Sequence, residues 1–250
     1  MLKKKLTKNE LTIGSWVMIG NSTSVEVMAS AGFDWLAIDL EHTSIDLENV
    51  QNLIQIIQSK KVKALVRVSK NEEVIIKKVL DMGADGIIVP MVCSKDDAIK
   101  AINYSKYPPA GKRGVGLTRA SGYGLYFEEY KEWVNKELII IPQIEHIDAV
   151  NNIDEILSVE GIDGVMIGPY DLSASLGYPG NFEEKKVRDS IQKVIDSCKA
   201  QNISSGFHVV DTDPKSLQIK IDQGFTFLAF GIDYMFMRNL AVDGIKRIKR

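Results

Sequence analysis

Residues 82–92 read MGADGIIVPMV, a helix end followed at once by a strand. Glycine commonly ends a helix because it adopts a left-handed backbone conformation at little cost, so Gly83 and Gly86 mark the break. The run that follows is rich in Ile and Val without polar alternation, which predicts a strand covered on both faces. Strands of this kind belong to parallel sheets flanked by helices.

The same unit recurs along the whole chain. Seven further apolar runs predict strands at 12–19, 35–40, 63–68, 138–144, 164–167, 205–210 and 226–230. Amphipathic segments between them predict helices, among them 47–59, 72–82, 96–104 and 183–200. Eight strands alternating with helices predict an α/β fold, a single (β/α)₈ TIM barrel over residues 1–250 with no internal domain boundary.

One long connection, at about 104–137, interrupts this rhythm and contains Arg113-Gly114-Val115-Gly116. Long ordered loops in compact domains usually have a function. We therefore expect the connection to lie over the active site or at a subunit contact.

Charge and composition exclude several classes of protein. Lys and Arg number 31 against 33 Asp and Glu, and a net charge of −2 argues against nucleic acid or a membrane surface as the main partner. No apolar run approaches the ~18 residues of a membrane span, and the basic start lacks the apolar stretch of a signal peptide. Cys93 and Cys198 lie far apart in no metal-binding pattern, which favours a reducing, cytoplasmic location.

Polar residues gather where the predicted strands end, and in such barrels the chemistry lies at the carboxyl ends of the strands. Following the second, third, fifth, sixth and seventh strands, these residues are Asp39, His42, Arg67, Gln143, Glu145, Asp171 and His208.

Two acids follow neighbouring strands, Glu145 after the fifth and Asp171 after the sixth. Two carboxylates so placed can bind one hard divalent cation and leave positions open for substrate and water. The alternative is a pair of solvated or helix-capping acids. A zinc site built on histidines fits less well, because no HxxxH pair exists.

The basic residues leave their roles open. Arg67 has apolar neighbours, so its guanidinium needs an anionic partner, either in a structural ion pair or at a developing enolate. His42 is the natural general base, with Asp39 or another acid to orient it, unless it is structural. The turn from Gly168 to Asp171 offers backbone amides to a carboxylate.

Taken together, these motifs resemble the HpcH/HpaI aldolase family, the class II pyruvate aldolases on the phosphoenolpyruvate/pyruvate type of TIM barrel. The resemblance runs from Gly14 to Asp233. It is carried by AGFDW with IDLEH (31–42), VRV (66–68), VPMV (89–92), YPP (107–109), RGVG (113–116), QIE (143–145) and VMIGPYDLS (165–173).

The resemblance implies roles residue by residue. Glu145 and Asp171 match the ligands of magnesium, manganese or cobalt. Arg67 matches the arginine at the keto oxygen, His42 the catalytic base, and Asp81 an acid that reaches that histidine from a neighbouring subunit. Residues implied on the substrate side are Trp16, Gln143, Gly168, Tyr170, Ser173 and His208.

The activity implied is reversible cleavage of a 4-hydroxy-2-oxo acid, such as a 2-keto-3-deoxy sugar acid, to pyruvate and an aldehyde through a metal-bound pyruvate enolate. The family also implies a homohexamer, a dimer of trimers with the last helix exchanged between subunits. Tyr170 and His208 depart from the residues common in relatives, so the aldehyde is left open.

Alternatives remain. A citrate-lyase-like lyase acting on an acyl-CoA shares the barrel and the acidic site, and a non-catalytic barrel that binds 2-oxo acids keeps the pocket. A Schiff-base aldolase needs a lysine at the carboxyl end of a strand. The predicted strands contain only Lys63, at the opposite end.

Overall fold

The computed structural model describes residues 2–248 and shows a closed parallel barrel in the order β1 to β8. The strands are β1 Thr12–Val17, β2 Trp35–Asp39, β3 Lys63–Arg67, β4 Gly86–Val89, β5 Ile139–Ile144, β6 Gly164–Ile167, β7 Ser204–Val209 and β8 Phe227–Ile232. Eight predicted strands overlap these eight, so the predicted TIM barrel is confirmed.

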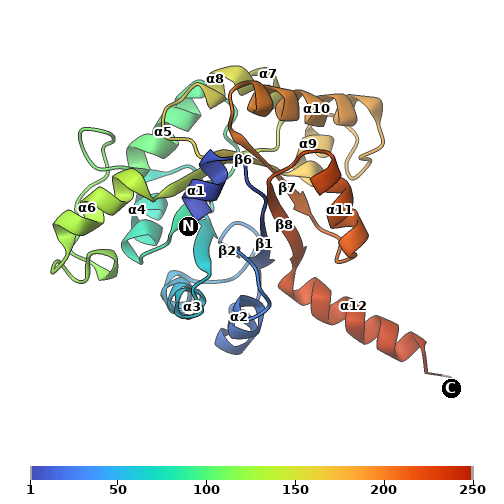
Figure 1. The fold of residues 1–250 in the computed structure, drawn as a ribbon, viewed down its shortest axis with the longest axis horizontal. Helices are drawn as coiled ribbons and strands as arrows, with labels where there is room; N and C mark the ends of the chain where they lie inside the picture. The colour runs from blue at the N-terminus through green and yellow to red at the C-terminus, as the bar shows by residue number, and fades with distance from the viewer. Residues whose placement is uncertain (1, 249–250) are drawn as a thin grey trace.

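Most helices follow the strands and cover the outside of the barrel, whereas α1 precedes β1 and α12 projects away (Figure 1). They are α1 Leu2–Thr7, α2 Ser22–Ala29, α3 Leu47–Ser59, α4 Glu73–Asp81, α5 Lys95–Ser105, the 3₁₀ turn η1 Arg119–Ser121, α6 Phe127–Lys136, α7 Ile147–Asn151, α8 Ile153–Leu157, α9 Pro169–Ser175, α10 Lys185–Ala200, α11 Pro214–Asp222 and α12 Asp233–Lys246.

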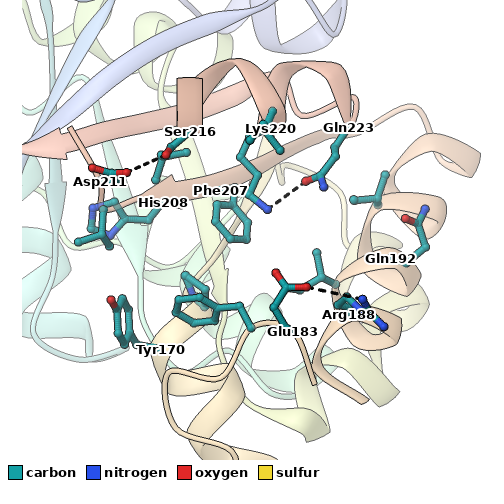
Figure 2. A pocket seen from close by; sticks show the side chains of 17 residues that line it. Tyr170, Glu183, Arg188, Gln192, Phe207, His208, Asp211, Ser216, Lys220 and Gln223 are labelled. Carbon is teal, nitrogen blue, oxygen red and sulfur yellow. Dashed lines mark hydrogen bonds and ion pairs between the residues drawn. The ribbon is translucent and has the colours of Figure 1, made fainter. Parts of the chain in front are cut away.

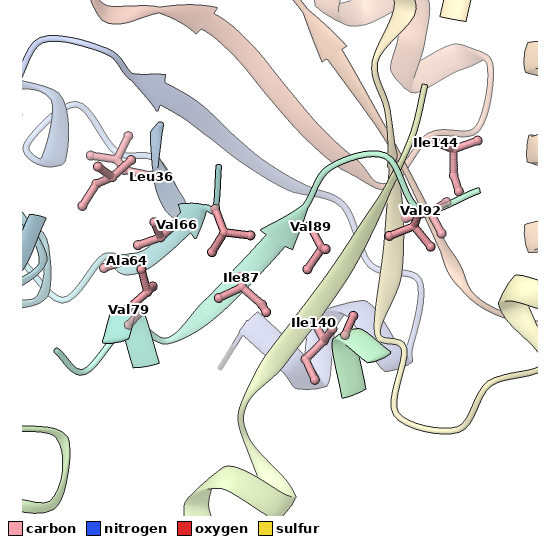
Figure 3. Close-up of a cluster of buried hydrophobic side chains, with 14 of the residues drawn as sticks. Leu36, Ala64, Val66, Val79, Ile87, Val89, Val92, Ile140 and Ile144 are labelled. Atoms are coloured by element: carbon pink, nitrogen blue, oxygen red, sulfur yellow. The ribbon is translucent and has the colours of Figure 1, made fainter. Parts of the chain in front are cut away.

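Side-chain alternation along the strands builds two cores. In β2, Leu36 and Ile38 join the large cluster between strands and helices, part of which Figure 3 shows. Trp35 and Ala37 join a second cluster that fills the barrel. Since both faces are buried, most strands read as apolar runs, whereas β1 and β7 also contain buried serines.

The short helix α1 closes the amino end of the barrel. Leu2 and Leu6 are buried in the inner cluster. Lys3 donates to the Leu138 carbonyl at 2.6 Å, and Lys5 pairs with Asp34 at 2.7 Å. Leu138 and Asp34 directly precede strands, so these contacts fasten the helix beneath the barrel.

The long connection lies at this same amino end, so it does not cover the carboxyl ends of its own barrel, and the other expected place, a subunit contact, stays a prediction. It joins the end of α5 to the start of β5, and both lie away from the carboxyl ends of the strands because each helix runs back down the barrel. Thr118 donates to the Asp81 carbonyl at 2.9 Å, and Arg119 donates to the Met82 carbonyl at 2.7 Å. The connection also contains α6, which the sequence analysis missed.

Helix α12 leaves the barrel and projects away from it (Figure 1). Met237, Leu240 and Ile245 on this helix are each more than half exposed. Among residues 2–248, no helix combines the length and apolarity that crossing a bilayer requires.

Candidate active site at the carboxyl ends of the strands

An arginine–carboxylate pair lies where β2 and β3 end. The parallel register places Asp39 directly opposite Arg67. The guanidinium donates from Nε to Asp39 Oδ1 at 2.9 Å and from Nη2 to Oδ2 at 2.7 Å. Arg67 is 8% exposed and Asp39 is fully buried. Two parallel bonds fix the plane of the guanidinium.

The other contacts of Arg67 are a ring and a second acid. Its Cζ lies 4.4 Å from the centroid of Trp16, and Nη1 lies 3.3 Å from Glu41 Oε2. Burial works to lower the pKa of Arg67, but the bonds to Asp39 and the charge of Glu41 raise it overall. The arginine is therefore a fixed cation in a mostly buried site.

His42 stands beside Glu41 rather than on Asp39. Asp39 Oδ1 accepts from the backbone N–H of Glu41 at 2.9 Å and of His42 at 3.4 Å, so Asp39 shapes this turn. The imidazole is exposed, and its Nε2 lies 3.8 Å from Glu41 Oε2. Of the two possibilities predicted from the sequence, Asp39 or another acid, the structure therefore places another acid, Glu41, nearest the imidazole.

Glu41 is a partly buried acid whose carboxylate is not fully hydrogen-bonded within residues 2–248. Its Oε2 is buried and has no hydrogen bond among the described residues. Burial raises the pKa of Glu41 above its usual value, and Arg67 opposes that effect. The sequence analysis quoted Glu41 within the motif at 39–42 but gave it no role; its place beside a candidate base was the available signal.

Glu145 lies just past the end of β5 and is almost completely buried. Its Oε1 accepts from the Met91 backbone N–H at 2.7 Å, and its Oε2 accepts from Gln143 Nε2. Met91 holds a left-handed φ of 52° just after β4. Burial raises the pKa of Glu145 to about 7, with Glu41 and Asp171 adding to the effect.

Asp171 lies in the first turn of α9, after the N-cap Gly168 and Pro169. It is exposed, and its charge acts on both Glu41 and Glu145. A Cβ on Gly168 would lie 3.0 Å from Glu145 Oε2, so only glycine leaves this approach open. Four acids, Asp39, Glu41, Glu145 and Asp171, thus share the site with a single arginine.

This donor set fits a divalent cation. Among residues 2–248 no group of three or more His, Cys, Asp and Glu residues has metal-binding geometry. The candidate site instead offers the carboxylates of Glu145 and Asp171, with the buried, unpartnered Oε1 of Gln143 between the strands. A hard cation binds oxygen ligands, and its positive charge would balance the carboxylates that Arg67 alone does not neutralise.

His208 lies inside the barrel against Trp16, with ring centroids 5.4 Å apart. Burial and the nearby Arg67 lower the pKa of His208 to about 3, so the imidazole is neutral. Its Nε2 is buried and has no hydrogen-bond partner in the part of the chain that the structure describes. Arg67, Trp16 and His208 therefore form one continuous wall.

Tyr170 and Ser173 point elsewhere. Ser173 is buried; its hydroxyl donates to the Tyr170 carbonyl at 2.8 Å and accepts from the Gly180 N–H at 3.0 Å, so it braces the turn after α9. Tyr170 packs edge-on against Phe182 with centroids 5.0 Å apart. The structure thus gives Ser173 a bracing role and no free hydroxyl.

Tyr170 and His208 mark one end of a groove of about 630 Å³ between α10 and α11 (Figure 2). Its floor is the outer face of β7 at Phe207, over which Lys220 Nζ lies 4.4 Å from the ring centroid. This groove lies outside the barrel and holds none of the acids described above.

Asp81 is the one predicted residue far from the others. It is the last residue of α4, which runs from the carboxyl end of β3 back to the amino end of the barrel. There its carboxylate pairs with Arg113 at 2.6 Å. Lys63, the only lysine in the eight strands, is also at this end and pairs with Asp85 at 2.6 Å.

The chain is similar to known aldolases over most of its length. Residues 12–239 match the family described as HpcH/HpaI aldolase/citrate lyase. The chain is 39% identical to a 2-keto-3-deoxy-L-rhamnonate aldolase of Escherichia coli over 93% of this chain and 87% of that protein. It is 36% identical to a hydroxypyruvate/pyruvate aldolase of Roseobacter denitrificans over 95% and 92%.

Solved structures of related proteins have the same fold. An HpcH/HpaI aldolase from Desulfitobacterium hafniense superposes with a TM-score of 0.91 at 31% identity, over 100% of this chain and 97% of that one. The structure of the citrate synthase SbnG gives a TM-score of 0.86 at 28% identity, over 98% and 96%. By barrel, site and sequence, this chain is a lyase that belongs to the HpcH/HpaI aldolase/citrate lyase family.

Proposed function

We propose that the protein is a metal-dependent aldolase that reversibly cleaves a 4-hydroxy-2-oxo acid to pyruvate and an aldehyde. The observation that carries this proposal is the arrangement of Arg67, clamped by Asp39, beside the acids Glu41, Glu145 and Asp171. This arrangement sets the fixed positive charge of Arg67 next to carboxylates that could bind a divalent cation. Both stabilise the enolate oxygen that such chemistry creates.

Glu145 and Asp171 would hold the divalent cation, with magnesium, manganese and cobalt as candidates. When bound, such a cation orients a 2-oxo acid and stabilises negative charge on its keto oxygen. Tyr170 and Asp171 lie in the first turn of α9, where backbone N–H groups lack helical acceptors and are available to a carboxylate. The Gly168 N–H is already bonded to the Ile144 carbonyl at 3.2 Å, so it is not available.

The chain's own residues would then act on the substrate. Arg67 Nη1 is the guanidinium nitrogen not bonded to Asp39, and it is the donor for the keto oxygen. His42 is exposed at the mouth, where it would take a proton from the pyruvate methyl group and later return it. His208 and Trp16 would line the aldehyde side, where a neutral, unpartnered imidazole favours a hydroxylated aldehyde such as one from a sugar acid.

A second copy of the chain is the proposed partner. Helix α12 exposes Met237, Leu240 and Ile245 while it projects from the barrel, which supports exchange of this helix within a homohexamer. Asp81 would meet His42 of a neighbouring copy. Cys93 and Cys198 are both free, which supports a cytoplasmic location.

The test is pyruvate methyl-proton exchange in D₂O, followed by NMR, because it needs no knowledge of the aldehyde. We expect exchange that depends on added Mn²⁺ and that falls at least ~100-fold in His42→Ala and Arg67→Lys. Arg188→Met, which removes an exposed arginine on α10, should exchange at the wild-type rate.

Other outcomes distinguish the alternatives. Absence of exchange with every metal would overturn the proposal; acetyl-group exchange from an acyl-CoA would then identify a citrate-lyase-like enzyme, and pyruvate binding alone a non-catalytic barrel. Borohydride with pyruvate should leave no covalent adduct, since Lys63 is engaged with Asp85 at the amino end.

A further inference from the structure

Asp81 is held by a single buried arginine. Arg113 Nη2 donates to Asp81 Oδ1 at 2.6 Å. Arg113 is 1% exposed, whereas the Asp81 side chain is 18% exposed. The cation is therefore below the surface and the acid is at it.

Two tyrosines fix the position of Arg113. Its Cζ lies 4.8 Å from the ring centroid of Tyr107 and 5.6 Å from that of Tyr130. The Tyr130 hydroxyl accepts from Nη1 and Nη2, each at 3.2 Å, and donates to the Leu80 carbonyl at 3.1 Å. Among residues 2–248, Arg113 Nε has no hydrogen-bond partner, so the bonds to Asp81 and Tyr130 orient the guanidinium.

The second oxygen of Asp81 is free. Oδ2 has no hydrogen bond among the described residues, and Gly116 faces it: a Cβ there would lie 3.1 Å from Oδ2. The residues on either side of this glycine, Val115 and Leu117, are 61% and 62% exposed. A glycine thus faces Oδ2, and the residues before and after it in the loop are exposed and apolar.

Asp81 cannot serve the active site of its own barrel. It ends α4 at the amino end, whereas His42 follows β2 at the carboxyl end. At the amino end, Asp81 Oδ2 is therefore placed to meet a molecule that docks on this end of the barrel.

We propose that Arg113 is a positioning residue: held by Tyr107 and Tyr130, it binds Asp81 Oδ1 so that Oδ2 points to His42 of a neighbouring copy. Arg113 touches neither substrate nor His42 and acts only through Asp81. The proposal rests on the proposed function, since exchange at pyruvate is its readout.

The first experiment is a double-mutant cycle in the exchange assay. Arg113→Lys keeps the charge but cannot bind Asp81 and Tyr130 together, so exchange should slow about 10- to 100-fold at saturating pyruvate with KM unchanged. In an Asp81→Asn background the same substitution should slow exchange no more than about 2-fold. Equal losses in both backgrounds would show a general structural effect and overturn the proposal.

Because Arg113 is buried, a variant outside the core provides a second test. Gly116→Ala places a methyl group against Oδ2, and should slow exchange in the wild-type background without lowering the melting temperature. Wild-type exchange in Gly116→Ala would contradict the uncovered Oδ2 as the functional atom.

Mixing two variants that each slow exchange tests the use of a second copy. His42→Ala and Arg113→Lys, refolded together at equal amounts, should recover about a quarter of the wild-type rate, since random pairing joins an intact His42 to an intact Arg113–Asp81 at one site in four. A mixture no faster than the variants alone would overturn the proposal, provided wild type exchanges. No exchange in wild type would instead overturn the proposed function.

Discussion

Replacing Arg67 by methionine removes the partner of a carboxylate that has no exposed surface. Asp39 would lose two charge-assisted bonds, at 2.9 and 2.7 Å, and keep only the backbone N–H groups of Glu41 and His42. Bonds to charged groups contribute about 1.5–3 kcal/mol each, and breaking a buried ion pair costs about 3–5 kcal/mol. We therefore expect the free energy of unfolding to fall by about 4 kcal/mol, a large part of the roughly 5–15 kcal/mol of a typical domain.

Urea unfolding followed by circular dichroism measures this loss. The double variant Asp39→Asn with Arg67→Met replaces the stranded charge by a neutral amide of the same shape, and should recover about 2 kcal/mol or more of the loss. It should not recover pyruvate exchange, because Arg67, the proposed donor to the keto oxygen, is still missing. Arg188→Met, whose side chain is exposed, should change stability by less than about 0.5 kcal/mol.

Two results would refute this reasoning. A loss below about 1 kcal/mol in Arg67→Met would mean that Asp39 is not left as an unpaired buried charge. A double variant as unstable as the single one would mean that lost packing against Trp16, not lost charge pairing, controls stability.

Three further predictions concern the metal, pH and packing. Chelator should abolish exchange, and Mn²⁺ should restore it and raise the melting temperature of wild type but not of Glu145→Gln. Because the folded pKa of His208 is about 3, below the usual 6.5, only the unfolded chain binds this proton between those values; stability should fall as pH drops below about 6.5. His208→Gln should remove about 2 kcal/mol of that loss at pH 5, as urea unfolding across pH would show; parallel curves would contradict it. Gly14→Ala should lower the melting temperature sharply, because its Cβ would meet the Trp35 ring at 2.0 Å while that ring is stacked on Phe227 at 4.3 Å; an unchanged melting curve would refute this.

The barrel was predictable because burial on both faces leaves each strand as an apolar run between helices. Strand ends were less so. The apolar run continues to residue 92, but β4 ends at Val89. The strand stops there because Met91 adopts a left-handed conformation and donates its N–H to Glu145. That turn depends on a residue 54 positions away along the chain, which local pattern does not reveal.

The missed helix α6 had a readable signal. Phe127, Tyr130 and Val134 repeat at helical spacing, Glu128 lies in the first turn and Lys136 in the last. The placement of the whole connection was also predictable, since any segment between a helix and the next strand of such a barrel lies at the amino end.

The candidate site was predictable as a set of residue types and less so as a set of pairs. Strand ends bring Arg67 and Glu145 to one edge by topology alone. Either Asp39 or Glu41 could pair with Arg67 on grounds of charge, and both lie near it. The register of β2 and β3 decides that Asp39 makes the two-bond pair. The Arg113–Asp81 pair joins segments 32 residues apart through side-chain packing, and no periodic pattern encodes it.

The pairing of Asp39 with Arg67 across two adjacent strands has a consequence for redesign. Backbone ladder bonds between β2 and β3 hold this pair, and the loops that follow β6 and β7 contribute nothing to it. Libraries at His208, which contacts Trp16 rather than Asp39, would therefore leave the Asp39–Arg67 pair and the enolate chemistry proposed for it in place. The scaffold is in that sense modular: the sheet fixes the Asp39–Arg67 pair, and the wall at His208 is open to directed evolution.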